Sequence, residues 1–278
     1  MTENRLILKT AYDLFTGRHS SFGLPLSALS LWVLPREEYL DAFGRACARL
    51  GRGVPSSFNQ LASVRDNFRA ELLCTSSEAV ILLETSLSRL GDETLQILLH
   101  ELGHAHCDLE NLRQPPLWIP DRAEADWFLY IQGKRMWGEF SAEQLAYDAL
   151  PDPARFQSAG LPVEFRGLLK DTAVYPERMG FFFFRCHVLH LGENELAEHL
   201  QLTEPAAVCG PLLSSLSALL DCTEARLRSN HFSLWESEFL IHLGALMLDV
   251  INHYLAYFDG FERFLFNSSD YDRSEELI

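Results

Sequence analysis

Residues 100–104 read His-Glu-Leu-Gly-His, and this pentapeptide constrains the chain more than any other stretch. In a helix, positions four apart lie on the same face, one turn above the other. A helical pentapeptide therefore directs the imidazoles of His100 and His104 toward one point and places Glu101 beside them. Neutral imidazole is the commonest protein ligand of metal ions. We accordingly expect a metal-binding helix here.

The residues around the pentapeptide have the pattern of an amphipathic helix. Gly91 and Asp92 supply a start, because an Asp side chain accepts hydrogen bonds from the free N–H groups of a first turn. Apolar residues then recur at helical spacing, at Leu95, Ile97, Leu98, Leu99 and Leu102. The alternative is a core helix whose histidines and glutamate merely face solvent.

Two imidazoles leave a catalytic zinc ion one protein ligand short, since such sites usually have three protein ligands and a water molecule. After a loop with three prolines, residues 121–130 are predicted to form a second helix. Glu124 lies in its first turn, 20 residues after the second histidine of the pentapeptide. Carboxylates are common in first turns for reasons of charge alone. Asp121, Asp126 and Glu110 are therefore competing ligands.

The pentapeptide followed by Glu124-Ala-Asp-x-Phe resembles the glutamate-ligand zincin metallopeptidases, or gluzincins, and among them the ImmA/IrrE-like peptidases. The second motif of those peptidases typically reads Glu-Ala-Asn-x-Phe-Ala, whereas this chain has Asp126 and Leu129 at the Asn and final Ala positions. The resemblance covers about residues 70–138. Metzincins are disfavoured, because Glu110 stands where that group has its third histidine and Cys107 where it needs glycine.

The resemblance implies a zinc-dependent endopeptidase in which His100, His104 and Glu124 bind Zn2+ and Glu101 is the general base. The residue types suit that chemistry, because imidazole and carboxylate are ordinary zinc ligands and a glutamate can accept a proton from a metal-activated water. Asp126 is a further expectation. It would orient a ligand histidine through the second ring nitrogen, as metal-bound imidazoles normally require.

Upstream of the pentapeptide, residues 78–85 are predicted to form a strand, because they are rich in aliphatic and β-branched residues and are bounded by turn residues. In zincins the strand before the active-site helix commonly forms the sheet edge along which an extended substrate pairs. We therefore expect Val80, Ile81 and Leu82 to line the substrate. A buried strand that contributes only to the core is the open alternative.

These elements predict an α+β fold in which a small sheet packs on the active-site helix and the second ligand helix. We expect this zincin-like domain to occupy residues 1–150, with a mainly helical region at 151–278, although both parts could form one domain. The predicted strands of the first part are 29–34, 71–74 and 78–85, and its predicted helices are 36–50, the pentapeptide helix, 121–137 and 141–150. The predicted helices of the second part are 187–200, 204–220 and 233–258.

Composition restricts the partners and the location. A formal net charge of -16 opposes nonspecific nucleic-acid binding, which depends on neutralising phosphates with Lys and Arg. The chain has no membrane-length apolar segment, no secretory signal and six scattered cysteines without a CxxC pair. We expect a cytoplasmic protein without membrane or nucleic-acid partners that acts on a protein or peptide substrate.

A function of another class remains open. It is a zincin-fold sensor or interaction module that holds the metal with little or no turnover, because ImmA/IrrE-like proteins often act on regulators. A deformylase is disfavoured, because the Gly-Cys-Leu element that this family has upstream of its own HExxH is absent.

Overall fold

The computed structural model describes residues 3–54, 68–113, 124–153, 176–199, 206–228 and 236–258. Its first part contains α1 (Glu3–Arg18), β1 (Leu29–Leu34), α2 (Tyr39–Arg49), β2 (Ala70–Cys74), β3 (Ala79–Glu84) and α4 (Asp92–Arg113). Then follow α5 (Glu124–Ala149), α8 (Pro176–Val188), α9 (Glu193–His199), α10 (Ala206–Arg228) and α11 (Ser237–Phe258). A small sheet with many helices confirms the α+β class.

The chain divides into two compact units. Among the described residues, the first unit contains 3–113 and 142–153, and the second contains 124–141 and 176–258. Helix α5 is continuous and contributes to both. Residues 124–141 of this helix belong to the second unit with the C-terminal helices. From the sequence, the whole of residues 1–150 was expected to form one domain.

The first unit is built on a three-stranded sheet in the order β1-β3-β2. Strand β1 pairs with β3 in parallel, and β2 pairs with β3 antiparallel, so that Ile81 lies between Leu31 and Leu72. A tight turn joins β2 to β3, in which the Thr75 N–H donates to the Glu78 carbonyl over 2.8 Å. The three strands predicted from the sequence are confirmed.

The expected role of β3 at the sheet edge is wrong. Strand β3 is the central strand, with β1 on one side and β2 on the other. Val80, Ile81 and Leu82 are each 0% exposed. The physical reason is their unbroken apolar run, which is typical of a strand covered on both faces rather than of an edge. These residues belong to the core and cannot pair with a substrate.

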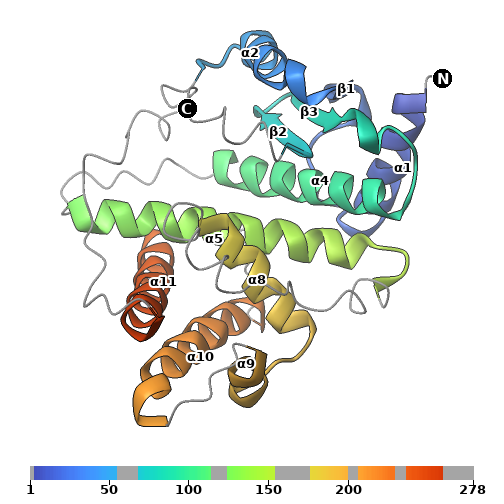
Figure 1. Ribbon diagram of the computed structural model, residues 1–278. Helices are drawn as coiled ribbons and strands as arrows, with labels where there is room; N and C mark the ends of the chain where they lie inside the picture. The colour runs from blue at the N-terminus through green and yellow to red at the C-terminus, as the bar shows by residue number, and fades with distance from the viewer. Residues whose placement is uncertain are drawn as a thin grey trace. The chain divides into compact units, whose positions relative to one another are not determined.

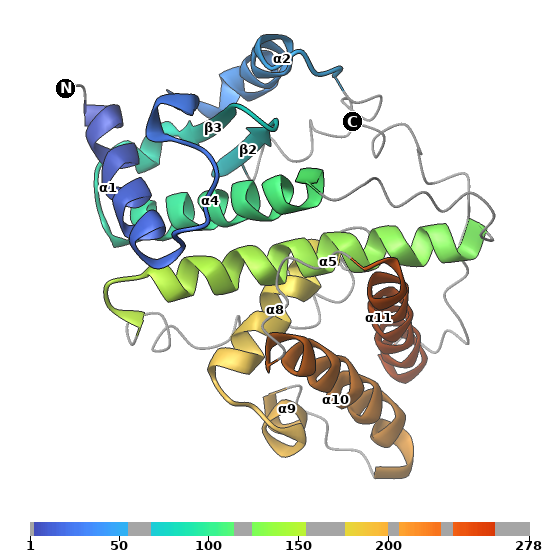
Figure 2. The same ribbon diagram turned by 180° about the vertical axis from the view of Figure 1, so that it is seen from behind.

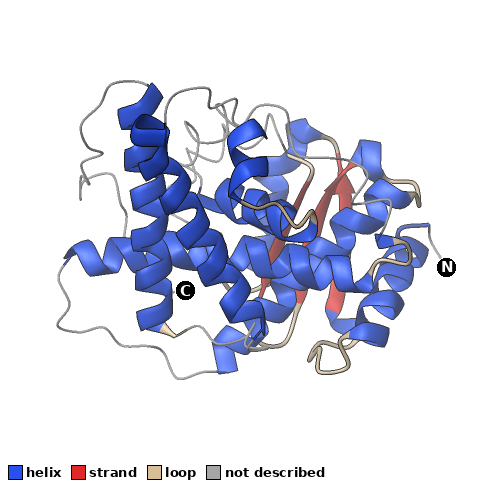
Figure 3. Cartoon of the chain, turned by 90° about the horizontal axis from the view of Figure 1, so that it is seen from below, coloured by secondary structure: helices blue, strands red, loops and turns tan. Residues whose placement is uncertain are grey.

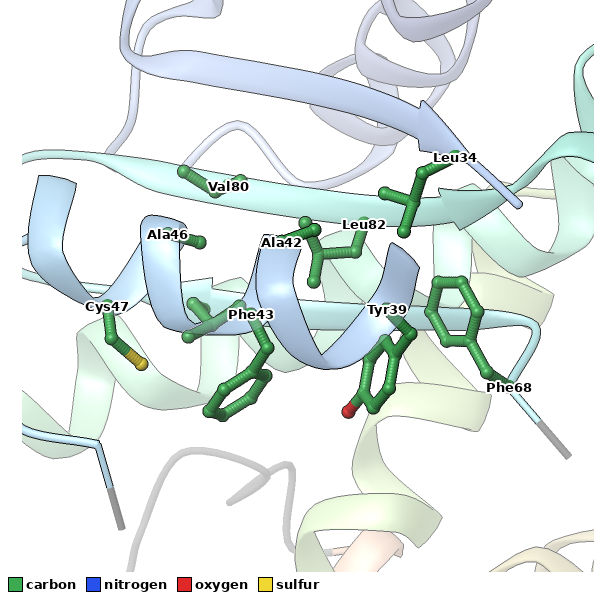
Figure 4. Close-up of a cluster of buried hydrophobic side chains, with 10 residues drawn as sticks. Leu34, Tyr39, Ala42, Phe43, Ala46, Cys47, Phe68, Val80 and Leu82 are labelled. Atoms are coloured by element: carbon green, nitrogen blue, oxygen red, sulfur yellow. The ribbon is translucent and has the colours of Figure 1, made fainter. Parts of the chain in front are cut away.

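Helices cover both faces of the sheet in the first unit. Helix α2 lies on one face, and α4 lies on the other with α1 beside it (Figures 1 and 2). Tyr39, the first residue of α2, packs its ring against those of Phe68 and Phe43, with centroids 4.4 and 6.0 Å away. These rings belong to one buried cluster with Val80 and Leu82 of β3 (Figure 4). Helix α1 was not predicted from the sequence.

In the second unit all the described regular elements are helices (Figure 3), and a short turn at residues 189–192 separates α8 from α9. Within it, α5 and α11 approach closely at two glycines. A Cβ atom on Gly133 would lie 1.9 Å from the Leu240 carbonyl oxygen, and one on Gly244 would lie 2.0 Å from that of Leu129. Both glycines are therefore required by backbone contact. No helix in the described ranges has the length and apolarity to cross a bilayer.

The contact at Gly133 predicts how a methyl group added there would change the stability of the protein. Gly133→Ala should lower the free energy of unfolding by about 2 kcal/mol, because backbone atoms must move to admit the new Cβ. Gly44→Ala in α2 is the matched control, since a Cβ there meets nothing within 4 Å, and it should raise stability by up to about 1 kcal/mol. Urea denaturation measures both. Equal stability of Gly133→Ala and the wild type would contradict the α5–α11 contact.

Candidate metal centre

Helix α4 carries the pentapeptide, as the sequence predicted. It begins at Asp92 and continues for 22 residues. Leu98, Leu99 and Leu102 are fully buried, whereas His100 and His104 are partly exposed. The apolar residues therefore fix the helix against the core and leave both imidazoles beside accessible space.

The two imidazoles face each other through their Nε2 atoms, which are 3.0 Å apart. Their ring centroids lie 4.5 Å apart and the ring planes are nearly perpendicular, at 89°. Two nitrogen ligands of one tetrahedral zinc ion, each about 2.05 Å from the metal, are separated by about 3.3 Å. The observed Nε2 separation is close to that value. His100 and His104 thus present their lone-pair positions to one point.

A carboxylate from α5 completes a set of three donors. His100, His104 and Glu139 each offer a ligand atom, and these atoms lie within 4.8 Å of one another. All three residues are partly buried. Two imidazoles and one carboxylate are a donor set that suits zinc and related divalent ions. Among the described residues, this group could hold a metal ion.

Gly103 within the pentapeptide allows α5 to approach α4 at this site. A Cβ atom on Gly103 would lie 2.6 Å from the Ala142 carbonyl oxygen and 2.9 Å from its Cα atom. Such distances leave no room for a side chain, so the two helix backbones are in contact here. Glu139 lies one helical turn before this contact, and Glu143 directly follows Ala142. The glycine therefore brings both carboxylates to the histidines.

Glu143 holds the first histidine from its other side. Its Oε1 atom lies 3.0 Å from Nδ1 of His100, and both side chains are largely buried. A metal-bound imidazole normally has a carboxylate or carbonyl at its second nitrogen, which fixes the ring orientation. The sequence analysis gave this role to Asp126. That residue precedes Glu143 on α5 by 17 positions, or about 26 Å of helix, so the expectation for Asp126 is corrected to Glu143.

Glu124, the expected third ligand, is the first residue of α5, and its side chain lies outside the described residues. The backbone of Glu139 follows 15 positions later on the same helix, about 22 Å along its axis. A glutamate side chain spans only a small part of that length. The carboxylate that the structure places beside the two imidazoles is that of Glu139.

Glu101 lies next to His100 on α4 and is only 7% exposed. Its charge acts on Tyr39 of α2. Burial raises the pKa of the Tyr39 hydroxyl far above its usual value, and the carboxylates of Glu71 and Glu101 raise it further. Tyr39 consequently keeps its proton at neutral pH. The carboxylate of Glu101 is therefore largely buried, and the nearby Tyr39 hydroxyl is uncharged.

Cys107, three residues after His104, is buried and belongs to the core. Burial raises the pKa of its thiol, and the nearby carboxylates of Asp108 and Glu110 raise it further. The thiolate is the form of cysteine that binds metals. Cys107 therefore packs as a small core residue, and it is not among the three donors that the structure brings together.

Comparison with models of protein families, with curated proteins and with solved structures finds no match to this chain. The candidate site is therefore supported by its own geometry and residue types.

Glu139 and Glu143 were not predicted from the sequence. One helix was predicted to end near Trp137 and another to begin at Ser141, where Ser-Ala-Glu-Gln has a capping-box pattern. The structure instead continues α5 from Glu124 to Ala149. One signal was available, since Glu139 and Glu143 are four positions apart, as the two histidines are. Read as one helix, the segment presents two carboxylates on one face.

The geometry predicts which glutamate binds the metal. Glu139→Gln should weaken zinc binding by at least about 100-fold, because the effect of losing a direct ligand should exceed that of an outer-shell change, which is typically 10-fold to 100-fold. Glu124→Gln, the same substitution on the same helix, should change affinity less than about twofold. Competition with a chromophoric zinc chelator measures both. Loss of affinity in Glu124→Gln alone would restore the ligand expected from the sequence.

Proposed function

We propose that the chain is a zinc-dependent endopeptidase of the gluzincin kind, related to the ImmA/IrrE-like peptidases. The observation that carries the proposal is the convergence of His100, His104 and Glu139 within 4.8 Å of one another. This convergence supports a single divalent ion with one position left for water, the usual arrangement of a catalytic zinc site.

Zinc bound at these three residues would supply a Lewis acid that lowers the pKa of a bound water to about 7 and polarises the carbonyl of the scissile bond. Glu143 would keep the His100 ring in its binding orientation, through the 3.0 Å contact with Nδ1. The Gly103 contact with Ala142 would keep the carboxylate of Glu139 within reach. The chain itself therefore supplies a site that is fixed before substrate arrives.

Glu101 is the proposed general base. It is adjacent in sequence to His100, and its side chain is largely buried. A carboxylate in that position would accept a proton from the attacking water and return it to the nitrogen of the leaving amine. The proton then ends on the new amino terminus, and Glu101 is regenerated.

An extended substrate would pair with β2 rather than with β3. Among the described strands, β2 lies at an edge of the sheet and packs directly against α4, which carries the histidines. The outer N–H and C=O groups of an edge strand are free to pair with another chain. This assignment replaces the one that the sequence suggested, and it keeps the substrate beside the active-site helix.

We further propose a cytoplasmic location. None of the six cysteines forms a disulfide bond, and five of them are buried. Free thiols in a chain of this size are typical of a reducing compartment.

The general base gives the direct test. Glu101→Gln should bind zinc as the wild type does but lose about 100-fold or more in the rate of peptide hydrolysis, the usual contribution of general-base catalysis. Glu93→Gln is the control, because Glu93 lies exposed in the first turn of α4 and pairs with Arg69. Its rate should stay unchanged. Mass spectrometry of a peptide library incubated with zinc-loaded protein measures the cleavage.

Two outcomes would contradict the proposal. Equal cleavage by Glu101→Gln and the wild type would remove Glu101 from the mechanism. Zinc-loaded wild type that cleaves nothing would instead favour the sensor or interaction module.

A further inference from the structure

A cavity of about 450 Å³ lies between α1 and β1 in the first unit. Its walls are residues 29–32 of β1, residues 26–27 just before that strand, and Asn4, Arg5 and Leu8 of α1. None of the residues assigned to the metal centre lines it. Its volume is in the range of ordinary ligand sites, about 300 to 1,000 Å³.

The lining residues place this cavity along the outer edge of β1. Successive side chains of a strand point to opposite faces of a sheet. A space bounded by four consecutive strand residues, Leu29 to Trp32, therefore cannot lie above one face alone, and it must follow the backbone edge. The other edge of β1 is paired with β3. The cavity consequently adjoins the side of β1 that has no strand partner among the described residues.

The cavity favours a carboxylate-bearing ligand. Arg5 is the one charged residue among its described lining residues. The Arg5 side chain is exposed, at the start of α1. A guanidinium group offers a fork of N–H donors that matches a carboxylate. An acidic side chain is thus the complementary partner.

We propose that the groove between α1 and the free edge of β1 binds an extended acidic segment of another protein. The segment would add as a fourth strand beside β1, with main-chain hydrogen bonds along the edge. One of its acidic side chains would pair with Arg5. Its alternate apolar side chains would lie on the opposite face of the added strand, beside Trp32. This binding site is separate from the proposed peptidase site.

A single strand fits the groove better than a second copy of the chain. Paired strands lie about 4.8 Å apart, and a dimer formed edge to edge would bring a whole sheet to β1. Helix α1 forms the opposite wall of the cavity, at Asn4, Arg5 and Leu8. One extended chain needs only the space beside the strand edge, whereas a second sheet would also bring the helices on its two faces to this wall.

A pair of blocked heptapeptides tests the proposal. The probe alternates Val and Glu and carries a fluorophore, and its counterpart has Lys in place of Glu. Fluorescence anisotropy with the full-length Glu101→Gln protein avoids hydrolysis of the probe. The Glu peptide should bind at least about tenfold more tightly than the Lys peptide. Arg5→Gln should weaken its binding about fivefold, the upper range for an exposed ion pair.

Lys9→Gln is the matched control, because Lys9 lies one turn after Arg5 on α1 and does not line the cavity. It should change affinity less than twofold. A second readout tests strand pairing itself. N-methylation of alternate peptide residues should abolish binding in one alternate set and leave it intact in the other, since alternate N–H groups face β1.

Several results would overturn the proposal. These are equal affinity for the Glu and Lys peptides, equal effects of Arg5→Gln and Lys9→Gln, or equal tolerance of both N-methylated sets. A protein that sediments as a dimer, and that Arg5→Gln converts to a monomer, would also overturn it by assigning the edge to a second copy.

Discussion

The backbone contact between Gly103 of α4 and Ala142 of α5 is the constraint on which the candidate metal centre depends. A side chain at position 103 would separate the helices, since its Cβ atom would lie 2.6 Å from a carbonyl oxygen. With glycine there, a carboxylate oxygen of Glu139 comes within 4.8 Å of ligand atoms of His100 and His104, and Glu143 comes beside Nδ1 of His100. Gly103 thus allows Glu139, the candidate ligand, and Glu143, which lies beside His100, to reach the histidines.

The sheet gives this arrangement its support and determines which surfaces remain for partners. Because β3 is central, its apolar residues hold α2 and α4 on opposite faces, and the two edges fall to β1 and β2. Helix α4 packs against β2, whereas the β1 edge borders a cavity walled by α1. We propose different roles for the two edges, an extended substrate at β2 and an acidic segment at β1.

Local patterns predicted what depends on local chemistry. The periodicity around the pentapeptide gave the course of α4 and its start at Asp92, and aliphatic runs gave the three strands. Strand order is a long-range property, so the buried run of β3 could be read either as an edge or as a centre. The capping-box pattern at Ser141 suggested the start of a new helix, but α5 continues through it. The face of α5 that meets α4, and with it Glu139, depends on that packing.

The most direct test of the account is the identity of the groups around bound metal. Zinc X-ray absorption spectroscopy of the loaded protein should show two imidazole nitrogens and oxygen ligands at about 2.0 to 2.1 Å. In Glu139→Gln, the oxygen contribution should fall or the bound zinc should be lost, while Glu124→Gln should give the wild-type spectrum. A spectrum with fewer than two imidazoles, or one that Glu139→Gln leaves unchanged, would contradict a centre built from His100, His104 and Glu139.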